Sequence, residues 1–147
     1  MKKKHKNQKF IISTLIFSLL ILSAIITIFS VDNKTNEKVI GYISSCGWKT
    51  EKTPYEISHI KIPSEFNSVY KAYNALQEKS GFDLSPYKGK TVSRYSYRIL
   101  NHKSSSSRLV SANILVFKDE IIAADISSFG DDGFIIEITN TADIISD

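Results

Sequence analysis

The sequence has little cysteine and no acidic residue near its start. Its 147 residues contain one cysteine, Cys46, and none of its 15 aspartates and glutamates lies before Asp32. A single cysteine excludes an internal disulfide framework and a cysteine-rich zinc module. A chain of this length allows one folded domain and excludes a large multidomain enzyme. The roughly 115 residues after the acid-free segment suffice for one hydrophobic core.

The positive net charge is concentrated at the start of the chain. The sequence has 19 lysines and arginines and a formal charge of +4, but five of the lysines lie within residues 1–9. From Asp32 onward, 14 bases face 15 acids, which leaves a net charge of −1. A near-neutral domain lacks the basic surface that attracts phosphate backbones. We therefore expect no nucleic-acid partner.

Residues 10–31 contain no charged side chain. As a helix, such a segment is roughly 33 Å long, which matches the hydrocarbon core of a bilayer. We therefore expect residues 10–31 to form a transmembrane anchor whose partner is the lipid bilayer. The alternative is a cleaved signal peptide, whose apolar region usually has about 7–15 residues and ends in a cleavage site with small residues. The sequence ITIFSV at 26–31 is a poor cleavage site.

The lysines before the apolar segment predict its orientation. Positive residues favour the cytoplasmic side of a membrane span, so the N-terminus is expected inside the cell. The expected localisation is the cell membrane, with a single span and an extracytoplasmic C-terminal domain. The predicted parts are a basic cytoplasmic tail (1–9), the anchor (10–31), a polar spacer (32–36), an extracytoplasmic domain (37–138) and a C-terminal tail (139–147). We expect this last tail to be frayed, and the alternative is that Ile144 and Ile145 dock on the domain.

The apolar periodicity of the domain predicts an α+β fold. Apolar residues at helical spacing predict a first helix at residues 37–46, which Gly47 ends. They predict a second helix that begins at the N-cap Ser64 and is ended by Gly81. Alternating patterns predict strands at 56–62, 91–101, 108–117, 121–127 and 134–138. We expect Trp48 in the core. The prediction is a mainly antiparallel sheet of three to five strands with two helices on one face. Residues 90–103 are a candidate edge strand of this sheet, to which a partner could add a strand.

Short segments of the predicted domain share the pattern of one bacterial family. They are SCGW (45–48), IKIPSEF (60–66), VYKAYNALQ (69–77), GFDLSPYKGK (81–90), RYSY (94–97) and ANILVF (112–117). Together they resemble a family of small proteins of Gram-positive, Clostridium-like bacteria, the domain-of-unknown-function family four-eight-three-zero. The resemblance covers residues 37–134, and its most specific part is 81–90. It implies one N-terminal membrane span followed by one extracytoplasmic domain, and it implies no activity.

Two segments depart from the pattern of similar sequences. Those sequences carry Gly-Gly-Asp on the third strand and a histidine shortly after the Gly-Phe of the last strand. This chain has AAD at 123–125 and GFII at 133–136. The resemblance therefore carries no role of that glycine pair or of that histidine to this chain.

One strand and one aspartate form the candidate interaction surface. It consists of Arg94, Tyr95, Tyr97, Arg98 and Asp125. Alternating tyrosines and arginines are able to stack on bases or sugars. The alternative is that the tyrosines lie under a helix while the arginines face water.

The sequence contains no recognised catalytic motif. His59, His102 and Cys46 stand at no diagnostic spacing from a nucleophile or a carboxylate. The sequence GDDG at 130–133 has ligands that suit calcium, but it lacks the alternating pattern of a calcium loop and is typical of a tight turn. We expect no catalytic residue, no cofactor and no metal.

Anchoring and the missing catalytic motifs together favour a non-enzymatic interaction or regulatory module of the cell envelope. Such a module is expected to bind another envelope protein, a peptide or a wall component. Two alternatives stay open. One is a small envelope or cell-wall hydrolase, which needs a carboxylate or histidine with a perturbed pKa in a cleft. The other is a subunit of an envelope or sporulation assembly.

Overall fold

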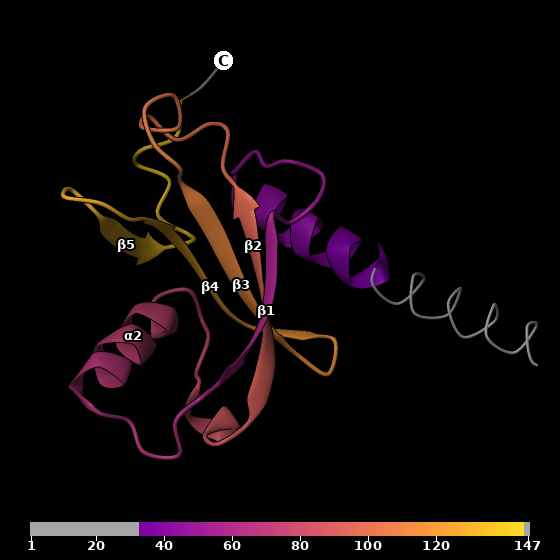
Figure 1. Cartoon of the computed structure of the whole chain (residues 1–147), viewed down its shortest axis with the longest axis vertical. Helices are drawn as coiled ribbons and strands as arrows, with labels where there is room; N and C mark the ends of the chain where they lie inside the picture. Colours follow the sequence, from indigo (N-terminus) through magenta and orange to yellow (C-terminus); the bar gives the residue numbers. More distant parts are fainter. Residues whose placement is uncertain (1–32, 146–147) are drawn as a thin grey trace, which may run out of the picture. The chain divides into compact units, whose positions relative to one another are not determined.

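The computed structural model describes residues 33–145 (Figure 1). The chain divides into two compact units, residues 1–35 and 36–147. The predicted cytoplasmic tail (1–9) and anchor (10–31) lie outside the described residues. Among residues 33–145, none of the helices has the length and apolar character that a membrane crossing requires.

The second unit is built on one five-stranded sheet in the order β1-β2-β3-β4-β5, with every neighbouring pair antiparallel. The strands are β1 (Glu56–Lys61), β2 (Thr91–Arg98), β3 (Ser111–Phe117), β4 (Glu120–Ser128) and β5 (Phe134–Glu137). The α+β prediction and the mainly antiparallel sheet are thereby confirmed. Because β2 pairs with β1 on one side and β3 on the other, the prediction of a free edge at residues 90–103 is wrong.

Two helices accompany the sheet. Helical backbone covers residues 33–45 and thus already includes most of the predicted spacer (32–36). The second helix, α2, spans Ser68–Glu78, and a short 3-10 turn, η1, spans Ser85–Tyr87. The N-cap of α2 is Asn67 and not Ser64, because the amide oxygen of Asn67 accepts a hydrogen bond from the Tyr70 backbone N–H at 2.9 Å. Gly81, with φ of 83°, follows the helix end as predicted.

The two helices lie on opposite faces of the sheet, so the prediction that both lie on one face is wrong. Val39 and Ile43 of the first helix pack in one buried cluster with the side chains of β2 to β4 that include Tyr97 and Ile114. The face of α2 carries a second cluster, which includes Leu115 (Figure 1). The reason is that β3 is apolar on both faces: Ile114 packs in the cluster beneath the first helix, and the next residue, Leu115, packs in the cluster beneath α2. Each face therefore needs its own cover.

The connections fit the turn chemistry of their residues. Lys118 and Asp119, between β3 and β4, both have positive φ (47° and 66°), which is the backbone of a two-residue hairpin turn. The register shifts between Leu115 and Val116, which marks a bulge in the same hairpin.

The segment after β5 is docked through residue 145 and is not a frayed tail. The Ile145 N–H donates to the Asn101 carbonyl at 2.8 Å, and Ile144 pairs with His102 in an isolated bridge. The indole N–H of Trp48, which is buried as predicted, donates to the Ile138 carbonyl at 2.7 Å. These bonds join the C-terminal segment to the core next to the first helix.

Candidate functional site

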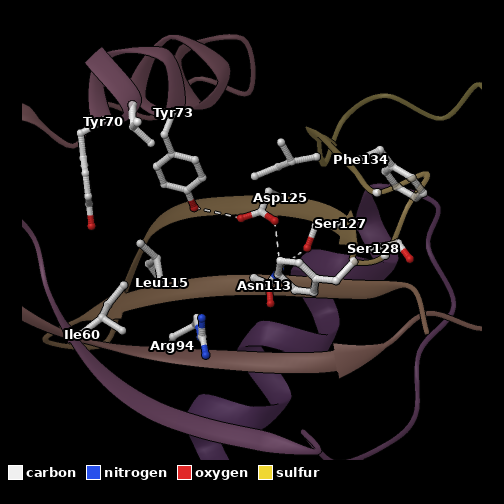
Figure 2. Close-up of a pocket in the computed structure, with 15 residues that line it drawn as sticks. Ile60, Tyr70, Tyr73, Arg94, Asn113, Leu115, Asp125, Ser127, Ser128 and Phe134 are labelled. Carbon is white, nitrogen blue, oxygen red and sulfur yellow. Dashed lines mark hydrogen bonds between the residues drawn. The ribbon is translucent and has the colours of Figure 1, made fainter. Parts of the chain in front are cut away.

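A cavity of about 580 Å³ lies on the α2 face of the sheet. It is bounded by α2, by the central strands and by the loop between β4 and β5 (Figure 2). Its apolar lining includes Ile60, Val69, Tyr70, Leu115, Phe129 and Ile135. The volume lies within the range of pockets that hold small ligands, which are mostly apolar with a few convergent polar groups.

The polar part of the cavity is a row of side chains from adjacent strands and α2. Strand pairing places Ser96 opposite Asn113 and Asn113 opposite Asp125, all on the same face. Asp125 is only 3% exposed. Its Oδ1 accepts from Asn113 Nδ2 and its Oδ2 from the Tyr73 hydroxyl, each at 2.9 Å. Asn113 also donates to Ser127 Oγ at 2.8 Å and accepts from Ser96 Oγ at 2.9 Å. Asp125 is therefore the centre of a connected polar network (Figure 2).

The electrostatics of the network follow from burial. Burial raises the pKa of Asp125, while hydrogen bonds from Asn113, Tyr73 and Ser127 and the charge of Arg94 act in the opposite direction. Burial and the neighbouring Asp125 raise the pKa of Tyr73 well above its ordinary value. Tyr73 is thus a neutral donor at physiological pH. Of the ion pairs formed within residues 33–145, none includes Asp125.

Arg94 lines the cavity but directs its ion pair elsewhere. Its guanidinium Nη2 donates to Glu56 Oε1 at 2.6 Å, a partner on the neighbouring edge strand β1. Its Nε is buried and, among the described residues, has no hydrogen-bond partner. Arg94 therefore contributes positive potential to the cavity while its charge is balanced by Glu56.

The predicted interaction surface is divided between two faces of the sheet. Arg94 and Asp125 line the cavity, whereas Tyr95 and Tyr97 are buried in the core beneath the first helix. Arg98 is exposed, with its Nε 3.8 Å from Glu51. Successive side chains of a strand point to opposite faces, so these five residues do not form one surface. The alternative interpretation is confirmed for the tyrosines and for Arg98, while Arg94 lines the cavity and is also 35% exposed to water.

Of the described residues, His59, His102 and Cys46 lie away from the cavity lining. His59 Nδ1 is 3.3 Å from Ser93 Oγ on the opposite face, and Cys46 packs against the core of the first helix. His102 is buried, and its ring stacks on the rings of Trp48 and Phe134. Among residues 33–145, no group of three or more His, Cys, Asp or Glu side chains is placed to hold a metal ion.

Three polar residues of the site were missed by sequence reasoning: Tyr73, Asn113 and Ser127. Tyr73 fits the apolar stripe of its helix, which concealed its role as a donor. The signal for the other two was present, because Asn113 interrupts an apolar strand and Ser127 follows Asp125 by two residues, on the same face. Only the register reveals that these positions are neighbours.

Comparison with known families identifies the chain. Residues 42–126, more than half of the sequence, match the family described as "Domain of unknown function (DUF4830)". The chain belongs to this family. No curated protein and no solved structure matches the sequence. The DUF4830 segment includes Tyr73, Arg94, Asn113 and Asp125, while Ser127 and the loop after β4 lie beyond it. The family segment thus contributes the floor of the cavity, and the residues after it contribute one wall.

Proposed function

We propose that this DUF4830 protein is a non-enzymatic binding module that holds a small, largely apolar ligand in the cavity above Asp125. The observation that carries the proposal is a cavity of about 580 Å³ in which an apolar lining surrounds one buried, hydrogen-bonded carboxyl group. Such a combination is typical of ligand sites, because the apolar walls supply affinity and the polar group fixes orientation.

The side chains of the cavity favour binding over catalysis. Nucleophilic hydrolysis usually pairs a nucleophile with a general base beside it, such as a serine with a histidine. The cavity lining contains no histidine, cysteine, lysine or second carboxylate. Both oxygens of Asp125 accept hydrogen bonds from Asn113 and Tyr73, which fix the carboxyl group in one orientation. A fixed carboxyl group suits recognition.

The location belongs to the same proposal. A span at residues 10–31, with its lysines inside the cell, places the cavity outside the cytoplasmic membrane, where it samples extracellular or envelope molecules. In this arrangement the ligand-bound domain acts on another envelope protein. Protease added to intact protoplasts is expected to digest the C-terminal domain. Complete protection, or release of the chain into the medium by cleavage just after Val31, would overturn this location.

Binding is tested on the full chain in lipid nanodiscs with a library of small apolar compounds followed by NMR. We expect hits that shift the resonances of residues around the cavity. The blocking variant is Val69→Trp, because Val69 lines the cavity yet is 70% exposed, so that a larger side chain is tolerated by the fold. The matched control is Leu100→Trp, at a 52% exposed position that is not in the lining. Hits that bind equally to the blocking variant, or a library without hits, would refute the proposal.

A small hydrolase is the second candidate, favoured by one observation. Burial raises the pKa of Asp125, and a perturbed carboxyl group in a cavity is a feature of acid–base sites. The test is incubation of the full chain with purified cell wall and with peptide and ester substrates. Turnover that Asp125→Asn abolishes would replace the binding proposal. Turnover that survives Asp125→Asn would come from elsewhere.

A further inference from the structure

We infer that the ligand of the cavity is a small organic ammonium ion with an apolar body, whose N–H groups bind the Asp125 carboxylate. This inference rests on the proposed function and names its ligand class. Its starting point is a buried acidic group without an ion-pair partner: Asp125 is 3% exposed, and no ion pair formed within residues 33–145 includes it. A buried ionised carboxylate is costly unless it is paired, so the cavity is complementary to a cation.

The neighbouring charged groups do not fill that role. The nearest cationic side chain in the lining is Arg94, and it donates at 2.6 Å to Glu56. Arg94 lowers the pKa of Asp125 through its charge, but its Nη2 is held by Glu56 and it forms no ion pair with Asp125. The remaining titratable groups in the lining are the hydroxyls of Tyr70 and Tyr73, and burial raises the pKa of Tyr73, which keeps it a neutral donor. The one acidic side chain in the lining is therefore Asp125, and a bound cation would stabilise its ionised form.

The carboxylate has bonding capacity left for a ligand. An ionised carboxylate offers about four acceptor positions. Tyr73 and Asn113 each use one, on different oxygens, and Ser127 also hydrogen-bonds to the group. An ammonium N–H is able to use the remaining position. A ligand carboxylate, in contrast, meets a like charge.

Aromatic rings stand beside this carboxylate. Tyr70 and Tyr73 come from α2, and Figure 2 shows Tyr73 directed at Asp125 and Tyr70 on the same side of the cavity. The rings contact one another edge to face, with centroids 6.3 Å apart. Aromatic faces attract cations and also pack against alkyl or aryl groups. The cavity thus combines an anion with walls that suit an amine on an apolar body.

The cavity volume distinguishes a small molecule from a protein side chain. A volume of about 580 Å³ is that of a site for a whole small ligand, and one lysine side chain fills only a fraction of it. We therefore assign the site to a free small amine. A lysine-containing peptide is the competing source of the same chemistry, and the experiment separates the two.

The test uses the full chain in nanodiscs at pH 7.5 and three probes of one shape: 4-phenylbutylamine, 4-phenylbutan-1-ol and 4-phenylbutanoate. We expect the amine to bind about tenfold or more tightly than the alcohol, and the carboxylate to bind most weakly. In Asp125→Asn the preference for the amine is expected to fall to within about twofold. Asp119→Asn makes the same charge change in an exposed turn that tolerates asparagine, and is expected to keep the preference.

The outcomes separate this inference from the proposed function. Equal binding of amine and alcohol, with both lost in Val69→Trp, would refute the ammonium ligand and leave the binding module intact. A preference that survives in Asp125→Asn would also refute it. Tighter binding of the tripeptide Ala-Lys-Ala with blocked ends than of the amine would overturn the small-molecule assignment. If none of the three probes binds, the inference fails, and the library experiment alone decides the binding module. Should Asp125→Asn not fold, competition between amine and alcohol on the wild-type chain gives the same ranking.

Discussion

Removing the Tyr73 hydroxyl tests whether α2 is attached to the sheet through a buried charge. In Tyr73→Phe the Asp125 carboxylate loses the donor that lies 2.9 Å from its Oδ2. Hydrogen bonds to charged groups contribute about 1.5–3 kcal/mol, and the Asp125 side chain is only 3% exposed. We expect the free energy of unfolding to fall by about 2 kcal/mol at pH 7.5.

The loss is expected to depend on pH, because it requires an ionised Asp125. Burial raises the pKa of Asp125 in the folded state above its ordinary value of 3.8, so the folded carboxyl group holds its proton more tightly than the unfolded one. Its contribution to stability is complete below 3.8 and is lost as the pH rises through the folded pKa. Tyr73→Phe raises that folded pKa further. The wild type and the variant should therefore converge at low pH and separate as the pH rises.

The assay is urea unfolding of the full chain in detergent micelles at several pH values. Trp48 is the single tryptophan of the sequence and is 1% exposed, so its fluorescence reports unfolding directly. A double-mutant cycle with Asp125→Asn isolates the contribution of the charge. A loss of equal size at pH 4 and pH 7.5, or a loss that persists unchanged in the Asp125→Asn background, would show that the Tyr73 hydroxyl does not stabilise an ionised Asp125.

Three further predictions concern the groups around the cavity. Gln77 Oε1 accepts a hydrogen bond at 2.8 Å from the N–H of Ala124, the residue just before the part of β4 that pairs with β5. Gln77→Met should therefore lower the free energy of unfolding in urea by about 1–3 kcal/mol. No loss would mean that water accepts the hydrogen bond of this N–H. A Cβ on Gly133 would lie 3.0 Å from the Gly130 and Ser128 carbonyl oxygens, which is too close without a shift of the backbone. Gly133→Ala should therefore shift the NMR resonances of the β4–β5 loop and weaken ligand binding. Unchanged spectra would contradict this. Burial lowers the pKa of His102 below 6.5, so the unfolded chain binds a proton at a higher pH than the folded chain and the free energy of unfolding should fall as the pH drops below about 6.5. His102→Gln should reduce this pH dependence between about pH 7.5 and 5.5. An unchanged pH dependence would mean that other groups cause it.

The sequence predicted those elements whose signals are local. Gly47 and Gly81 both have positive φ (87° and 83°) and follow the helix ends that they were expected to mark. The alternating strands gave the antiparallel sheet, because period-two patterns and short turns leave few other arrangements. The N-cap of α2 was misplaced by three residues, since Ser64 and Asn67 both suit a cap and only the fold selects one.

The sequence did not predict the cover of the sheet or the site. Leu115 and Ile114 are neighbours in β3 and both are buried, although their side chains point to opposite faces of the sheet. This one strand therefore contributes to two hydrophobic clusters. Local periodicity does not reveal which helix covers which face. The site depends on the register that sets Asn113 opposite Asp125 and on the docking of Tyr73 from α2. Both are long-range choices that no short window of sequence contains.

The position of a bound amine decides whether the cavity above Asp125 is the binding site. Intermolecular NOEs are recorded between 4-phenylbutylamine and the full chain in nanodiscs, with the aromatic and methyl groups of the protein assigned. We expect contacts of the ligand with Tyr73 and Leu115, on the α2 face of the sheet. Contacts that fall instead on the opposite face, beside the first helix, or a complete absence of contacts at saturating ligand, would contradict it.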